Sequence, residues 1–406
     1  MTADLVFPAA DAALLQEIAS WDGFRPATFA AGEYPVDVVR LAGSASPPIV
    51  VARARRAETL KALPVSLRQR AAAAFERAGA QSVSLHLAHG RSLDLSQGPV
   101  VLGVVNVTPD SFSDGGLAFD TGRAIARALE LFELGAAAVD VGGESTRPAA
   151  YGPAEEVSED EEMRRVVPVI EGIRRRTQAP LSIDTRRAAV ALRAIEAGAD
   201  LVNDVSALRF DPAMADAVAR SGAGVLLMHM RGIDPRTMQR DTTYGHLVAE
   251  VAAALAEAAG RARAAGIPAN AIALDPGLGF GKSAEGNLLL LRHLAALRSL
   301  GYPVAIGASR KGFVRRFSGV ADDSPPGDRV PGSLACAAAA ADAGAALIRV
   351  HDVAETSRFL RMRRAIATPA PRTSPATAPS RGPGAAPRDE HPEGSATSPR
   401  AGAVSS

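Results

Sequence analysis

Polar side chains that could bind a substrate follow short apolar segments throughout the middle of this sequence. The apolar segments read as β-strands, and each is followed by residues that can donate or accept hydrogen bonds. The residues at these strand ends are Asn106, Asp140, Asp184, Asn203 with Asp204, His229, Asp275, Ser309 to Lys311, and Arg349 with His351. One polar strand end could simply cap a helix, but a chain that only had to fold would not require so many. We therefore infer that the strand ends meet at one functional site.

Three of these residues suit a flat heterocyclic ligand. Asp184 and Asp275 supply carboxylate acceptors, and Asn203 supplies an amide. Together such groups can read N–H and amino donors along one edge of a heterocycle.

Other strand-end residues suit an anion and a cation that accompanies it. Lys311, Arg349 and His351, together with Arg147, supply positive charge and N–H donors for phosphate or carboxylate. Asn106 offers an oxygen of the kind that Mg²⁺ takes beside phosphate oxygens. The residues thus indicate a heterocycle, a diphosphate and a magnesium ion, without saying which compounds carry them.

Two further patterns look like known binding sites, but their residues do not meet the requirements of those sites. The segment DPGLGFGKS (275–283) looks like a phosphate-binding P-loop, but Pro276 stands where such a loop needs glycine. Its glycines are better explained by close backbone approach at a strand end. His229 and His351 are isolated from other ligands at zinc-site spacing. The single cysteine, Cys336, lies among small residues and is expected to be an inert packing residue.

The elements that would position these residues alternate regularly. Strands ending near the residues above are each followed by an amphipathic helix, and the predicted helices cover residues 120–134, 158–176, 186–197, 211–220, 243–265, 284–299, 332–343 and 353–365. Ser158 opens one of them with a capping box, and a glycine follows most helix ends. Eight such units over about 265 residues fit a (β/α)8 TIM barrel. An open doubly wound sheet is the alternative. Residues 82–96 read as a leading hairpin that turns at His89-Gly90.

The two ends of the chain differ from this pattern. Residues 1–80 combine a strand-like segment (47–55) with a helix-like one (66–80), which indicates a small N-terminal α/β extension without a catalytic motif. We interpret it as a structural or docking extension. The barrel would occupy residues 81–366. Residues 367–406 are rich in Pro, Ala, Ser and Gly and are expected to form a disordered C-terminal tail.

The composition limits the kinds of binding partner and the cellular compartment that we expect. The formal net charge is +1, so there is no large basic field for nucleic acid. The first residues show no basic stretch before an apolar run, so no signal peptide is expected, and no apolar run is long enough for a membrane span. We therefore expect a soluble, cytoplasmic protein whose partners are small molecules, with no nucleic-acid or membrane partner.

The middle of the chain resembles dihydropteroate synthases, the folate-pathway enzymes. The resemblance rests on stretches that run in the family's order over about 285 residues. They are VVLGVVNVTPDSFSDGG (100–116), AVDVGGESTRP (138–148), PLSIDT (180–185), LVNDVS (201–206), LLMHM (226–230), LDPGLGFGKS with Asn287 (274–287), IGASRKGF (306–313), and PGSLACA with LIRVHDVAET (331–356). It implies condensation of (7,8-dihydropterin-6-yl)methyl diphosphate with 4-aminobenzoate to 7,8-dihydropteroate and diphosphate. It also implies a homodimer.

The resemblance also implies residue roles. Asn106 would bind Mg²⁺ on the diphosphate. Asp184, Asn203, Asp275 and Lys311 would hold the pterin, while Arg349 and His351 would bind the diphosphate with Thr146 alongside. The residues expected to be catalytic are Asp184, Lys311, Arg349 and His351. The loops 107–119 and 144–157 would close over the site, the first with Asp110 and Asp114 facing a carbocation and the second with Arg147 and Pro148 near the aminobenzoate.

Some positions depart from the family pattern, and two other functions stay open. Ala149 follows the TRP stretch where the family usually has glycine, one extra residue lies between Gly232 and Pro235, and Gly312 follows Lys311. None of these changes an expected chemical group. A pterin-dependent methyltransferase would share the acidic pterin residues but would not need SRKGF. A catalytically silent pterin-binding barrel would be favoured by loss of Asn106, Lys311 or the RVH triplet, and all are present.

Overall fold

A computed structural model describes most of the chain. It covers residues 3–21, 23–26, 29, 33–44, 46–80, 83–107, 117–144 and 157–368, with the side chains of 117–120 excepted. The predicted disordered tail lies outside the described residues beyond Thr368, as do nearly all of the two predicted closing loops.

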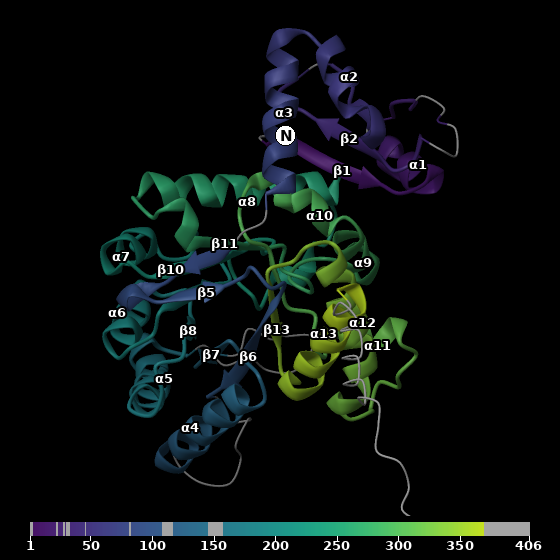
Figure 1. Cartoon of the computed structure of the whole chain (residues 1–406). Helices are drawn as coiled ribbons and strands as arrows, with labels where there is room; N and C mark the ends of the chain where they lie inside the picture. The colour runs from purple at the N-terminus through teal and green to yellow at the C-terminus, as the bar shows by residue number, and fades with distance from the viewer. Residues whose placement is uncertain are drawn as a thin grey trace, which may run out of the picture.

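Eight parallel strands form the centre of the molecule (Figure 1). They are β6 (Val100–Asn106), β7 (Ala138–Gly142), β8 (Leu181–Asp184), β9 (Leu201–Asp204), β10 (Gly224–Met228), β11 (Ile272–Asp275), β12 (Ala305–Ile306) and β13 (Leu347–Val350). The hydrogen-bonded order runs from β11 through β10, β9, β8, β7, β6 and β13 to β12. A parallel bridge between Leu274 and Val304 joins the two ends of this order. The predicted TIM barrel is confirmed, and the open-sheet alternative is wrong.

Helices surround the barrel in the predicted order, with one short helix, at residues 312–317, that was not predicted. They are α4 (Leu117–Glu133), α5 (Glu159–Arg174), α6 (Ala188–Glu196), α7 (Met214–Ser221), α8 (Leu247–Ala264), α9 (Ala284–Arg292), α10 (Leu294–Leu297), α11 (Gly312–Phe317), α12 (Val330–Asp342) and α13 (Val353–Ala367). The start of α5 shows why the sequence forms a helix here: Ser158 accepts a hydrogen bond from the N–H of Glu161, as the capping-box pattern predicts.

One predicted helix is wrong in its extent. Residues 284–299 form α9 and α10 instead of a single helix, and the break lies at His293, whose φ and ψ of −106° and 18° are not helical. The break lets the His293 ring leave the helix and lie against Trp21, with their ring centroids 4.8 Å apart. The reason is therefore a long-range contact that local sequence does not contain.

The predicted hairpin closes one mouth of the barrel. Strands β4 (Ser84–His86) and β5 (Ser92–Asp94) turn at His89 and Gly90, both at positive φ. The hairpin buries four leucines against residues at the starts of the barrel strands; the leucines are Leu85, Leu87, Leu93 and Leu95. Asp200, just before β9, accepts hydrogen bonds from Arg91 and Arg174, both at 2.7 Å. The amino-terminal mouth is thus filled, which leaves the carboxyl ends of the strands for ligands.

In its described residues, the N-terminal extension forms a three-stranded antiparallel sheet with three α-helices. Its elements are β1 (Leu5–Ala9), α1 (Ala12–Ser20), β2 (Val36–Arg40), β3 (Ile49–Ala52), α2 (Arg56–Ala62) and α3 (Val65–Gly79), with the strand order β1-β2-β3. It sits beside α8 and α10 (Figure 1). Ser299 joins the two parts, since its hydroxyl accepts from the N–H of Val6 and its carbonyl accepts from Arg77 Nε.

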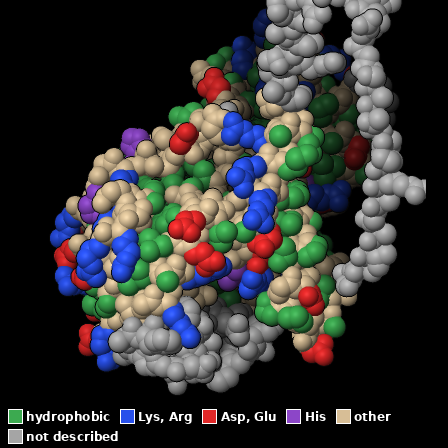
Figure 2. Space-filling view, turned by 60° about the horizontal axis from the view of Figure 1, so that its bottom comes forward, with side chains coloured by type: hydrophobic (Ala, Val, Ile, Leu, Met, Phe, Trp, Pro, Cys, Tyr) green, Lys and Arg blue, Asp and Glu red, His purple; other side chains and the backbone are tan. Residues whose placement is uncertain are grey.

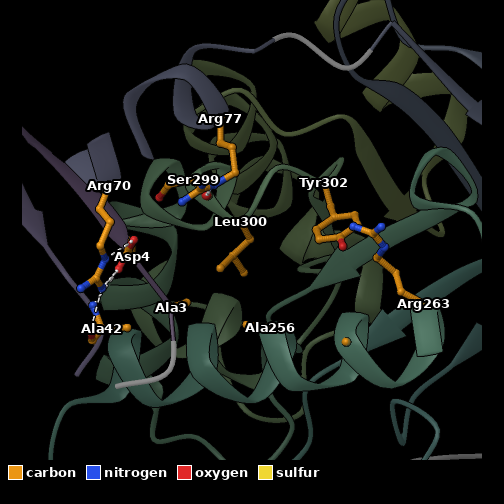
Figure 3. Close-up of a pocket in the computed structure, with 11 residues that line it drawn as sticks. Ala3, Asp4, Ala42, Arg70, Arg77, Ala256, Arg263, Ser299, Leu300 and Tyr302 are labelled. Carbon is orange, nitrogen blue, oxygen red and sulfur yellow. Dashed lines mark hydrogen bonds and ion pairs between the residues drawn. The ribbon is translucent and has the colours of Figure 1, made fainter. Parts of the chain in front are cut away.

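The junction leaves a cavity of about 480 Å³ between α3, α8 and the segment before β12 (Figure 3). Arg70 in this cavity is already paired with Asp4, and Arg263 lies at the far side, beside Tyr302. The basic groups do not converge on one point, so the cavity is a gap between two packed units.

Basic and acidic side chains are interspersed over the face shown in Figure 2. Within the described ranges, every helix is too short or too polar to cross a bilayer.

Candidate active site

The strand order brings the predicted residues together at the carboxyl end of the barrel. Asn106 pairs with Gly142, Gly142 with Asp184, and Asp184 with Asn203 across four neighbouring strands. Asp275 ends β11. Arg349 lies in β13, and His351 follows it. The barrel thus brings together residues that are up to 245 positions apart in the sequence (Asn106 to His351).

Arg349 is held between two carboxylates. Its Nε donates to Asp140 Oδ2 at 2.6 Å, and its terminal nitrogen donates to Asp184 Oδ2 at 2.7 Å. Asn203 Nδ2 donates to the same Asp140 oxygen at 3.0 Å. Asp140 is fully buried, so it anchors Arg349 and Asn203 from below while Asp184 remains partly open to the site.

The charge balance of this group affects Asp184. One guanidinium serves two carboxylates, and the burial of Asp184 disfavours its charged form. Burial raises the pKa of Asp184 to about 7; Arg349 opposes this shift and Asp140 adds to it. Asp184 can therefore exchange a proton near neutral pH.

Asp275 and Lys311 form the second half of the site. Asp275 Oδ1 accepts from the N–H of Gly277 at 2.6 Å, which leaves Oδ2 for a ligand. Lys311 Nζ donates to the carbonyl of Leu278 and lies 4.6 Å from the centre of the Phe280 ring. Burial lowers the pKa of Lys311 to about 8, against the pull of Asp275. An acceptor, a donor and an aromatic face thus border one space.

His351 completes the polar group. Its Nδ1 lies 3.1 Å from Ser309 Oγ, which leaves Nε2 for a ligand. Burial, with Arg349 nearby, lowers the pKa of His351 to about 4, so the ring is neutral at physiological pH. A neutral imidazole can still donate one hydrogen bond to a phosphate oxygen.

Comparison with known proteins identifies the family. The sequence model of pterin-binding enzymes matches residues 102–351. The dihydropteroate synthase of Escherichia coli is 43% identical over 275 residues, which cover 68% of this chain and 94% of that protein. This chain belongs to the dihydropteroate synthase family. The members of this family are transferases.

Solved structures of dihydropteroate synthases give the same result. A structure from Xanthomonas albilineans with 4-aminobenzoic acid is 45% identical, with a TM-score of 0.64, and the match covers 70% of this chain and 98% of that one. A structure from Yersinia pestis with a sulfonamide drug complex is 44% identical with the same TM-score, covering 70% and 99%. The range matched by the family model, residues 102–351, spans most of the stretches on which the resemblance to dihydropteroate synthases rested.

Not every predicted site residue falls within the described structure. Thr146 and Arg147 lie outside the described residues, so their roles stay predictions, as do those of Asp110 and Asp114. Sequence reasoning placed Asp140 on this face but missed that it anchors Arg349, because the two residues are 209 positions apart.

Sequence reasoning also missed the groups behind the Asp275 turn. Lys282 Nζ lies 2.8 Å from His229 Nδ1, and both residues are buried. The glycine spacing around Lys282 indicated close backbone approach, and this is confirmed. Gly277 has a φ of 68°, and a Cβ there would overlap the carbonyl oxygen of His229.

Proposed function

We propose that this chain joins (7,8-dihydropterin-6-yl)methyl diphosphate to 4-aminobenzoate, which yields 7,8-dihydropteroate and diphosphate. The observation that carries this proposal is the hydrogen bond of Arg349 to Asp184, with Lys311 following the neighbouring strand β12 and Asp275 at the end of β11. One structure of the related Xanthomonas albilineans enzyme is in complex with 7,8-dihydropteroate, at 43% identity.

The acidic half of the site suits the pterin ring. Asp184 and Asp275 each keep a carboxylate oxygen for the N–H and amino donors of the heterocycle, and Asn203 supplies its amide. Lys311 can donate to a ring acceptor while its charge is balanced by Asp275. Because the carboxylates of Asp184 and Asp275 are largely buried, these hydrogen bonds would be stronger than in water.

The basic half suits the leaving group. The bond between the pterin methylene carbon and the diphosphate oxygen breaks, and its electron pair leaves with the diphosphate. The electron-rich ring delocalises the positive charge on that carbon, and Arg349 and His351 would stabilise the departing oxygens, with Thr146 as a predicted partner. The amino nitrogen of 4-aminobenzoate then forms the new bond and releases a proton.

Asn106 is the residue that would hold magnesium. A Cβ built on Gly142 would lie 3.8 Å from both Asn106 Oδ1 and Asp184 Oδ2, so glycine keeps open a small space bordered by two oxygens. Magnesium in phosphate sites commonly takes one or two protein oxygens and completes its shell with phosphate and water. Asn106 fits that role, and the bound ion would neutralise charge on the diphosphate.

Two further expectations follow from family membership. The loops 107–119 and 144–157 would exclude water that could capture the carbocation, with Arg147 near the carboxylate of 4-aminobenzoate. We also propose a homodimer, on the basis of the resemblance alone, and a cytoplasmic location, on the basis of the sequence composition.

The deciding experiment measures diphosphate release by the purified chain. The pterin diphosphate and Mg²⁺ are supplied with and without 4-aminobenzoate. Release that needs both substrates, together with formation of dihydropteroate, supports the proposal. Pterin binding without product would favour the silent barrel and overturn the proposed activity.

A further inference from the structure

The turn between β11 and α9 contains a buried lysine that the proposed reaction does not use. Lys282 is 3% exposed. Its Nζ donates to three backbone carbonyl oxygens, those of His229 at 2.9 Å, Gly277 at 2.9 Å and Phe280 at 3.0 Å. His229 Nδ1 lies 2.8 Å from the same nitrogen. Lys282 therefore occupies the inside of the turn in the way that a bound cation would.

The same turn carries groups that border the proposed pterin pocket. The N–H of Gly277 fixes one oxygen of Asp275, and the carbonyl of Leu278 accepts from Lys311. The ring of Phe280 lies under Lys311 Nζ. A shift of this turn would therefore move the partners of both Asp275 and Lys311.

The turn has little steric freedom on its outer side. Gly277 and Gly281 both have positive φ, and a Cβ on either would overlap the segment that follows β10, at the His229 carbonyl or the Arg231 side chain. Glycine permits this close approach but supplies no side chain to hold it. Lys282 supplies the only side-chain link from inside this turn to the His229 carbonyl among the described hydrogen bonds.

Lysine is rare in this chain, and the geometry of the turn suits an ammonium group. Only three of the 45 basic residues are lysines, at positions 61, 282 and 311, and the chain otherwise uses arginine. An ammonium group has three N–H donors around one point, which matches three converging carbonyl oxygens. A planar guanidinium presents its donors in a wide fork and does not fit that arrangement.

We propose that Lys282 is a positioning residue for the pterin pocket. It cross-links the Gly277–Lys282 turn to the end of β10 and thereby holds Asp275 and Lys311 in the geometry that binds the pterin. This inference rests on the proposed function. Burial lowers the pKa of Lys282 well below its usual value. A neutral amine would still donate two hydrogen bonds and could accept a third from His229, so the cross-link persists in either protonation state.

The test compares substitutions in the full chain. Lys282→Met keeps the length and apolar stem but removes every donor, and Lys282→Gln keeps two donors on a shorter side chain. Lys61→Met is the matched control at an exposed lysine. Val218→Ala removes buried volume in α7 and controls for general destabilisation. The measurements are the Tm, the Kd for the pterin diphosphate without 4-aminobenzoate, and kcat/KM for each substrate.

We expect Lys282→Met to lower kcat/KM for the pterin substrate about 100-fold, mainly through a weaker Kd, and Lys282→Gln to lower it about tenfold. Val218→Ala should lower the Tm and leave kcat/KM within about twofold. The inference is overturned if Lys282→Met keeps the wild-type Kd and kcat/KM. It is also overturned if Val218→Ala has the same Tm as Lys282→Met and loses as much kcat/KM. If Lys282→Met does not fold, Lys282→Gln decides by the same comparison. A wild-type chain that neither binds the pterin substrate nor releases diphosphate would overturn the proposed function itself, and this inference with it.

Discussion

Arg349 determines the charge balance of the candidate site. It lies between Asp140 and Asp184, with both hydrogen bonds shorter than 2.8 Å. Asp140 is fully buried, and its Oδ1 has no hydrogen-bond partner among the described residues. Removing the guanidinium would therefore leave two buried carboxylates without their cation, a costly arrangement that protonation relieves.

The first prediction concerns this arginine. Arg349→Met should lower kcat about 100-fold or more, because the developing charge on diphosphate loses its main donor. The pKa of Asp184, which Arg349 holds down, should rise above its present value. Diphosphate release and carboxyl NMR titration measure the two effects. Arg193→Met on the exposed surface of α6 is the control, since that side chain pairs only with Glu196 among its described ion pairs.

The second prediction concerns pH. Asp184 must be ionised to accept from the pterin, and its pKa is about 7, so kcat/KM for the pterin substrate should fall as pH drops below about 7. Lys311 must be charged to donate fully, and its pKa is about 8, so kcat/KM should also fall above about 8. A narrow bell-shaped profile results.

Lys311→Arg tests which group causes the alkaline limb. Arginine stays charged, so that limb should disappear even though overall activity is lower. The expected bell is much narrower than the roughly three pH units between pH 6 and 9. If the wild-type kcat/KM stays constant over that range, the assignments of Asp184 and Lys311 are both contradicted.

The raised pKa of Asp184 also makes the free energy of unfolding depend on pH. Its folded pKa lies above the ordinary value of 3.8, so the folded chain binds more protons than the unfolded chain between about pH 4 and pH 7. This group alone therefore makes the free energy of unfolding decrease as pH rises through that window.

For single residues, the chemical types in the site could be predicted from sequence, but their contacts could not. The strand ends at Asn106, Asp184 and Asp275 are where the alternation predicts them. The pairing of Asp140 with Arg349, and of Lys282 with His229, depends on which strands become neighbours after barrel closure. Local sequence patterns do not contain that information.

Among the elements, the hairpin has the clearest structural role. Its turn could be predicted from His89-Gly90, but its function as a plug could not, because the residues it covers come from most of the barrel strands. Leu85 is fully buried there. The hairpin thus supports the barrel from the mouth opposite the candidate site.

The third prediction tests this separation. Leu85→Ala should cost about 2–5 kcal/mol of unfolding free energy, because it leaves a cavity in a closed apolar layer. The kcat/KM of the remaining folded protein should change little, since the site lies at the other end of the strands. Urea unfolding and initial rates measure the two. A matched change at the exposed Leu288 is the control, and a selective loss of activity in Leu85→Ala would show that the two mouths are coupled.

On the scale of the whole molecule, the N-terminal extension packs onto the barrel through a shared apolar cluster and specific polar contacts. His293, at the break between α9 and α10, is 2% exposed. Its ring lies against Trp21 and Phe7, and its Nε2 lies 2.8 Å from Glu17. A strand and a helix of the extension could be predicted from sequence, but this docking could not, because His293 reads as an ordinary helix residue.

The fourth prediction uses the only tryptophan of the chain, Trp21, as a reporter of the extension. In the wild type, thermal unfolding followed by Trp21 fluorescence should coincide with unfolding followed by far-UV circular dichroism, because the two parts share a buried interface. His293→Ala removes the ring and the Glu17 contact, at a cost of about 1–3 kcal/mol to docking. The fluorescence transition should then move to lower temperature than the circular dichroism transition, while the Kd for the pterin substrate stays the same.

The control is His86→Ala, at an exposed histidine on the hairpin, which should move neither transition. If both transitions shift together in His293→Ala, the extension and the barrel unfold as one cooperative unit. The extension would then be an integral part of the barrel domain and not a separately folding unit.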